Sequence, residues 1–186
     1  EILTYIGSED RILRPLNYPK GTPGRGANLY QTPNGSVLVI NAMGRVFMDA
    51  LDDPFAGVER ELSACALSEG ADAIVVDIHA EATSEKMAMG HFCDGRASLV
   101  VGSHSHVPTA DAQILPGGTA FQVDAGACAD YDSVIGMEKT EPVQRFVRKM
   151  ATQRYTPATG PATLCAVFVQ TGTGGLATRI DPVRLG

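Results

Sequence analysis

Short apolar runs rich in valine and isoleucine alternate with amphipathic stretches through the middle of this chain. Three of the runs, at Val37–Ala42, Ala73–His79 and Leu99–Val101, have the length and composition of buried strands. The stretches between them, Asp53–Glu69 and Thr83–Asp94, read as helices, the first with an apolar stripe and the second with N-cap residues at its start. Strands that alternate with helices predict a parallel sheet covered by helices, so the pattern indicates an α/β fold.

Outside this region the pattern predicts shorter elements. Glu1–Ile6 reads as the last turns of a helix, and a long loop rich in proline and glycine follows between Pro15 and Gly26. The later segments read as a hairpin at Ala112–Val123, a loop at Asp124–Gly136, a short helix at Glu141–Met150 and a closing hairpin between Thr163 and Pro182. No stretch has the composition of a linker, so residues 1–186 are expected to form a single domain.

Histidines stand where two of the predicted strands end. His79 is the last residue of one strand, and His104 and His106 follow Gly102, where the next strand stops. Open α/β folds bind ligands at the carboxyl ends of their strands. If the chain stays extended there, alternate positions place His104 and His106 on one side, as they place Asp77 with His79. A single histidine at a strand end is more often a hydrogen-bonded residue, but the three together favour a metal site.

Two further residues have less specific surroundings. Arg25 lies between two glycines, and a guanidinium beside flexible backbone suits phosphate binding, so Arg25 is a candidate substrate-binding residue. A surface arginine in a turn is the alternative. His91 falls inside a predicted helix, away from any strand end, and is expected to be structural.

Composition narrows the class of protein. Hydrophobic residues make up 44% and charged residues 19% of the 186 residues, which is typical of a globular domain with a substantial core. The net charge of −6 and the lack of a Lys/Arg-rich run argue against an extended nucleic-acid surface. No apolar stretch approaches the roughly 18–20 residues of a membrane span. The four cysteines show no C-x-x-C spacing, which favours a reduced, cytoplasmic protein.

Several long blocks of the sequence resemble one known family. DIHAEATSEK (Asp77–Lys86), GSHSHVPTADAQILPGGTA (Gly102–Ala120) and YDSVIGMEK (Tyr131–Lys139) resemble the YmdB-type phosphodiesterases, a branch of the calcineurin-like metallophosphoesterases. RPLNYPKGTPGRG (Arg14–Gly26) and GRVFM (Gly44–Met48) fit the same family. The resemblance implies a metallophosphoesterase-like α/β/β/α sandwich that hydrolyses phosphate esters, including cyclic nucleotides. It also implies two metal ions, typically iron, manganese or zinc, bridged by a hydroxide.

The resemblance also implies roles for single residues. His79 and His104 match ligands of one metal ion, and His106 matches a ligand of the other. Asp77 and Glu81 are candidates for carboxylates that orient the histidine rings, because a ligating histidine usually donates its other N–H to an acceptor. Solvated carboxylates near a strand end are the alternative.

The family's N-terminal motifs, which carry the bridging carboxylate and the proton donor, are absent from the 186 residues. The resemblance places them upstream of Glu1, so we expect an N-terminally truncated chain that covers the C-terminal portion of the fold without its N-terminal strands. No catalytic residue is expected in this chain, and it is expected to bind at most one metal ion by itself. A strand edge and apolar surface would be exposed, so we also expect a homo-oligomer.

Two functions remain open at this point. The first is a metal-dependent phosphodiesterase that acts on a small phosphate ester such as a 2′,3′-cyclic nucleotide. The alternative takes the 186 residues as complete: a non-catalytic metal-binding or interaction protein in which three histidines bind one divalent ion.

Overall fold

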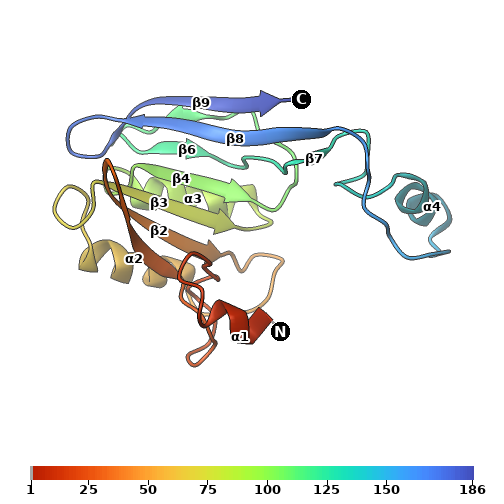
Figure 1. Cartoon of the computed structure of the whole chain (residues 1–186), viewed down its shortest axis with the longest axis horizontal. Coiled ribbons are helices and arrows are strands. Elements are labelled where there is room, and N and C mark those ends of the chain that lie inside the picture. The colour runs from red at the N-terminus through yellow and green to blue at the C-terminus, as the bar shows by residue number, and fades with distance from the viewer. Residues whose placement is uncertain (1) are drawn as a thin grey trace.

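A six-stranded mixed sheet forms the centre of the computed structural model, which describes residues 2–186 (Figure 1). In spatial order its strands are β1 (Ala27–Thr32), β2 (Gly35–Met43), β3 (Ala73–His79), β4 (Leu99–Ser103), β6 (Ala120–Gln122) and β5 (Gln113–Ile114). Strands β2, β3, β4 and β6 run parallel, and the edge strands β1 and β5 are antiparallel to their neighbours. The parallel α/β arrangement predicted from the sequence is confirmed.

Two helices cover one face of this sheet, α2 (Pro54–Ala64) and α3 (Thr83–Cys93). Between helices and sheet lies the main core, which contains fully buried aliphatic side chains of β2, β3 and β4: Ile40, Ile74, Val76, Ile78 and Val100. Each such side chain stabilises the fold by roughly 1.5–3 kcal/mol relative to an exposed one. The carboxylate of Asp53 caps α2 by accepting hydrogen bonds from the first backbone N–H groups of the helix. Helix α2 ends five residues earlier than predicted, because the chain turns back after Cys65 toward β3.

A second, three-stranded antiparallel sheet contains β7 (Ala129–Asp130), β8 (Ala162–Thr171) and β9 (Ala177–Leu185). It packs against the opposite face of the first sheet through Val75 and Val101 on one side and Val167, Val169 and Ile180 on the other. The described residues therefore stack as helices, sheet and sheet, and the expected α/β class is confirmed.

Two short helices complete the fold, α1 (Ile2–Ile6) and α4 (Thr140–Arg148), of which α4 lies apart from both sheets (Figure 1). Helix α1 confirms the helix predicted at the start of the chain from Ile2 onward, and the part of that prediction that falls on Glu1 lies outside the described residues.

Some elements differ from the sequence-based expectation. Strand β1 falls in a stretch without a predicted element, because most of its residues are polar and partly or fully exposed. Strand β6 is half of the predicted hairpin, but it also pairs in parallel with β4 and so extends the central sheet. Strand β7 lies within the predicted loop. Among residues 2–186, no helix has the length and apolarity that a membrane crossing needs.

Candidate functional site

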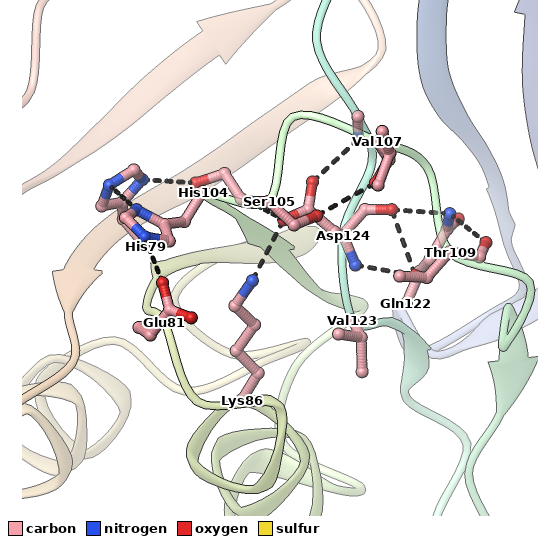
Figure 2. Close-up of polar contacts among 12 residues, drawn as sticks. His79, Glu81, Lys86, His104, Ser105, Val107, Thr109, Gln122, Val123 and Asp124 are labelled. Carbon is pink, nitrogen blue, oxygen red and sulfur yellow. Dashed lines mark hydrogen bonds and ion pairs between the residues drawn. The ribbon is translucent and has the colours of Figure 1, made fainter. Parts of the chain in front are cut away.

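Two histidine rings meet at the carboxyl edge of the parallel sheet. His79 ends β3 and pairs with Ser103, the last residue of β4, so that His104 follows directly beside it. The Nδ1 atom of His104 lies 3.1 Å from the Nε2 atom of His79, and the rings are edge-to-face with centroids 4.8 Å apart (Figure 2). Pairing of two parallel strands thus brings together two of the three predicted histidines.

The outer nitrogen of each ring is held by a hydrogen bond. Nδ1 of His79 lies 3.0 Å from the hydroxyl of Ser103, which in turn donates to a carboxylate oxygen of Asp77 at 3.3 Å. Nε2 of His104 lies 2.7 Å from a carboxylate oxygen of Glu81 (Figure 2). Of the two predicted carboxylates, Glu81 contacts the ring of His104 directly and Asp77 contacts that of His79 through Ser103. These contacts leave the two inner nitrogens facing one another.

The surroundings favour the neutral form of the His79 ring. Burial lowers the pKa of His79, and the neighbouring ring of His104 lowers it further. Burial also raises the pKa of Asp77, although hydrogen bonds from Asn41 and Ser103 oppose this shift. A neutral imidazole keeps a lone pair on one nitrogen, which is the form that binds a metal ion.

The inner nitrogens of His79 and His104 fit two ligands of one ion. Nitrogens bound to a single zinc ion at about 2.0–2.1 Å lie roughly 3.3 Å apart in tetrahedral geometry, and the observed separation is 3.1 Å. The hydrogen-bonded outer nitrogens match the surroundings of metal-binding histidines in general. However, residues 2–186 contain no group of three or more His, Cys, Asp or Glu side chains placed to hold a metal ion. The pair therefore offers two facing nitrogens, and the described residues do not form the three-histidine site of the alternative hypothesis.

The segment from His104 to His106 is a turn, so the expectation of an extended chain there is wrong. His104 has φ of +113° and His106 has φ of +66°, backbone angles that residues other than glycine rarely adopt. The ring of His106 lies 6.4 Å from that of His104, centroid to centroid. The cause is Asp124, whose carboxylate accepts a hydrogen bond of 2.8 Å from the backbone N–H of Ser105 and so bends the chain between the two histidines.

Asp124 belongs to a buried ion pair beneath this turn. The ammonium of Lys86, on α3, lies 3.0 Å from its carboxylate, and both side chains are only 1% exposed (Figure 2). Burial raises the pKa of Asp124, but hydrogen bonds from the N–H groups of Ser105 and Gly126, together with Lys86, outweigh burial and lower it. The stem of Lys86 passes close to Gly102, where an added Cβ would lie 2.7 Å from Cδ of the lysine. The ion pair thus fixes the backbone from which the histidines project.

Sequence reasoning missed Lys86, Asp124 and Ser103. Lys86 had a signal, because it shares the buried face of α3 with Met89 and Cys93, at helical spacing. A lysine on such a face needs an anion nearby. Ser103 and Asp124 had no comparable signal, since small polar residues at strand ends are common.

The remaining candidates lie outside this cluster. The guanidinium of Arg25 pairs with the carboxylate of Asp10 at 2.8 Å, and its role in substrate binding stays a prediction. His91 is exposed on α3.

Solved structures with the same fold define the class of protein. A crystal structure of a hypothetical protein from Thermus thermophilus matches with a TM-score of 0.89 and 43% identity, over 99% of this chain and 70% of that chain. A phosphatase from Mycoplasma pneumoniae matches with a TM-score of 0.87 and 25% identity, over 98% of this chain and 66% of that chain. The chain therefore has a phosphatase-like α/β fold.

Sequence comparison then gives the family. The family model described as YmdB-like protein matches residues 1–183, and the chain belongs to this family. A 2′,3′-cyclic-nucleotide 2′-phosphodiesterase from Bacillus subtilis strain 168 is 42% identical over 169 residues, which are 91% of this chain and 63% of the relative. The chain thus spans less than two thirds of that relative's length. The resemblance inferred from the sequence blocks is confirmed.

Proposed function

We propose that this chain forms part of a metal-dependent phosphodiesterase that hydrolyses phosphate esters such as 2′,3′-cyclic nucleotides. The observation that carries the proposal is the pair of inner nitrogens on His79 and His104, which face each other at 3.1 Å at the edge of the sheet. The family and the activity named for the Bacillus relative support the substrate class.

In this proposal His79 and His104 hold one divalent ion, which is iron, manganese or zinc, and His106 contributes to a second. Bound divalent ions polarise the phosphoryl group and activate water for attack. Ser103 and Glu81 fix the ring orientations. Loss of such a hydrogen-bond partner of a metal-binding histidine typically lowers metal affinity or activity by about 10–100-fold. The additional ligands and the proton donor are proposed to come from the part of the relatives that this chain does not span, so that the 186 residues alone bind at most one ion.

The test uses the protein expressed from its complete reading frame and reconstituted with Mn²⁺, Fe²⁺ or Zn²⁺. We expect metal-dependent hydrolysis of a 2′,3′-cyclic nucleotide, and a loss of at least about 100-fold in kcat/KM for His79→Ala and His104→Ala. His91→Ala, at an exposed position of α3, is the matched control and should keep both metal content and turnover.

Two outcomes would change the conclusion. Hydrolysis that survives His104→Ala would show that the chemistry lies elsewhere. Metal bound by the histidines without hydrolysis of any phosphate ester would favour the non-catalytic metal-binding alternative.

The four cysteines are free thiols, which supports a reducing, cytoplasmic location as part of the same proposal.

A further inference from the structure

A pocket of about 140 Å³ adjoins the candidate site, and its wall includes His106 and the turn that carries Tyr131, Ser133 and Ile135. We propose that this pocket binds the base of the nucleotide, and that Ile135 determines the affinity for the base. The inference rests on the proposed phosphodiesterase function, because it places the base beside the histidines that would hold the metal ions at the phosphate.

Ile135 lies exposed at the tip of a tight turn. Val134 and Met137 exchange two backbone hydrogen bonds, of 3.0 and 2.9 Å, so that Ile135 and Gly136 form the tip of a two-residue turn. Both tip residues have positive φ, +50° and +87°. Turns of this kind favour asparagine, aspartate or glycine at the first position, and a β-branched residue there is strained. Ile135 is nevertheless 57% exposed, so packing in a core does not explain an isoleucine at this position.

Hydroxyl groups in the pocket wall are occupied by the protein itself. The hydroxyl of Tyr131 donates to the carbonyl of Ala127 at 3.2 Å, and burial is the main cause that raises the pKa of Tyr131 to about 12, which keeps the phenol neutral. The hydroxyl of Ser133 donates to the carbonyl of Asp130 and accepts from the N–H of Gly136 at 2.9 Å.

The one carboxylate in the wall is also engaged. Asp130 accepts hydrogen bonds from the N–H groups of Asp132, at 2.8 Å, and Gly160, at 3.0 Å. These side chains therefore offer a ligand mainly apolar surface, with the imidazole of His106 at one side. A small, mainly apolar pocket beside a phosphate site fits a flat aromatic heterocycle.

The same contacts determine the selectivity of the pocket. A site that hydrogen-bonds its substrate discriminates strongly, whereas an apolar pocket separates similar ligands by only about 10–200-fold. Apart from His106, which the proposed function assigns to a metal ion, the polar side chains that could hydrogen-bond a base are already paired, so the pocket accepts purines and pyrimidines alike. We expect kcat/KM to differ by no more than about 200-fold among the 2′,3′-cyclic phosphates of the four common nucleosides.

The test compares two substrates in the complete, metal-loaded protein. One is adenosine 2′,3′-cyclic phosphate, and the other is methyl ribofuranoside 2′,3′-cyclic phosphate, in which a methoxy group replaces the base. For Ile135→Asn we expect KM for the adenosine compound to rise about tenfold, with kcat within about twofold of the parent and KM for the baseless compound unchanged. Asparagine tolerates the left-handed conformation, so the melting temperature should stay equal or rise.

Two variants serve as controls. Ile135→Val keeps a β-branched apolar side chain and should keep KM for both substrates. Ile114→Asn changes an isoleucine that is 39% exposed on β5, away from the pocket wall, and should leave both substrates unaffected. Binding of adenosine itself, measured by calorimetry, should weaken about tenfold in Ile135→Asn alone.

Other results separate the two proposals. An unchanged KM for the adenosine compound, or an equal loss with both substrates, would overturn the role of Ile135. If the parent protein hydrolyses neither substrate, the proposed function fails, and adenosine binding then decides the inference. Adenosine binding weakened only by Ile135→Asn would still support the pocket, and binding equal in all variants would overturn it.

Discussion

Asp124 is a buried anion whose hydrogen bonds bend the backbone between the two histidines of the turn. One carboxylate oxygen contacts Lys86 and the N–H of Ser105, and the other accepts from the N–H of Gly126. A buried charge is tolerated only when it is paired and hydrogen-bonded, and both conditions hold here. The ion pair thus supports the positive φ angles of His104 and His106, which would otherwise be unfavourable.

Asp124→Asn should therefore be severely destabilising. The change removes the anion and leaves the ammonium of Lys86 buried without a counter-ion, and breaking a buried pair in this way typically costs about 3–5 kcal/mol. Urea denaturation measures the unfolding free energy. The matched control is Asp132→Asn, whose ion pair with Lys139 is exposed and should contribute less than about 1 kcal/mol. Equal losses in the two variants would contradict the importance assigned to the buried pair.

At the scale of residues, the positions of the histidines can be predicted from the sequence better than the residues that hold their backbone and rings in place. His79 and His104 can be found because both follow apolar runs that end at the same edge of a sheet. The turn at His104 is missed, because strand alternation assumes extended backbone and the bend depends on Asp124, 20 positions later in the chain. Contacts between residues far apart in sequence leave no local pattern, and for this reason the role of Ser103 is not predictable.

At the scale of elements, one carboxylate links the start of α4 to the segment that follows the helix. Glu141, in the first turn of the helix, accepts hydrogen bonds from the side chain of Arg145 at 2.8 Å and from the N–H groups of Thr152 and Gln153 at 2.9 and 3.2 Å. Its carboxylate also accepts from the hydroxyl of Thr152. These bonds tie the start of the helix to the segment that leads back to the second sheet.

The same contacts predict how α4 responds to acid. The hydroxyl of Thr152, followed by Arg145, lowers the pKa of Glu141 from 4.5 to about 2. A lowered pKa in the folded state contributes stability that is fully present above pH 4.5 and is lost as the pH falls toward 2. We expect hydrogen-exchange protection of α4 to fall about tenfold over this range, after correction for intrinsic rates. Glu141→Gln should lower the protection at neutral pH and remove its dependence on pH, whereas Glu69→Gln, at an exposed position outside α4, should do neither.

The exposed face of α4 allows a test of the expected homo-oligomer, which stays a prediction. Val143, Phe146 and Val147 lie at helical spacing on α4 and are 48–74% exposed. Apolar stripes of this kind are typical of contacts between proteins. We expect the double change Phe146→Ser and Val147→Ser to reduce the mass measured by light scattering after gel filtration. Leu185→Ser, at a residue 62% exposed on β9, is the control. A mass equal to that of the parent would exclude this face of α4 as the contact.

Elements are predictable to the extent that their side chains are buried on a regular face. Strands β2 and β3 alternate buried and partly buried residues, and most residues of β4 are buried. The predicted bounds of all three lie close to the observed ones. Strand β1 is missed because its register with β2 comes from backbone hydrogen bonds at an exposed edge. The hairpin pattern predicts that β6 pairs with β5, its neighbour in the sequence, but it does not predict that β6 also pairs with β4.

At the scale of the whole molecule, the two sheets place the site at one edge. Residues of β3 alternate between the helical core and the second sheet, and His79 faces the same side as Val75 and Asp77. This side of β3 changes from apolar contact with β8 and β9 to polar contact near the carboxyl end. The sequence predicts the class of fold, but the packing of the second sheet on the first cannot be derived from strand patterns alone, because a hairpin that follows a sheet can lie on either face.

Metal binding should be visible in the stability of the 186-residue chain. An ion that binds only the folded state stabilises it by about 1.4 kcal/mol when its concentration is tenfold above Kd. For a domain of this size that corresponds to a rise in Tm of roughly 3–6 °C. We therefore expect Zn²⁺ to raise Tm with a stoichiometry of at most one ion, and His79→Ala and His104→Ala to remove the rise. His91→Ala should keep it, because this ring is exposed on α3, away from the facing nitrogens. A rise that persists in His104→Ala would show that the ion binds elsewhere, and the histidine pair would then be a hydrogen-bonded contact and not a pair of ligands.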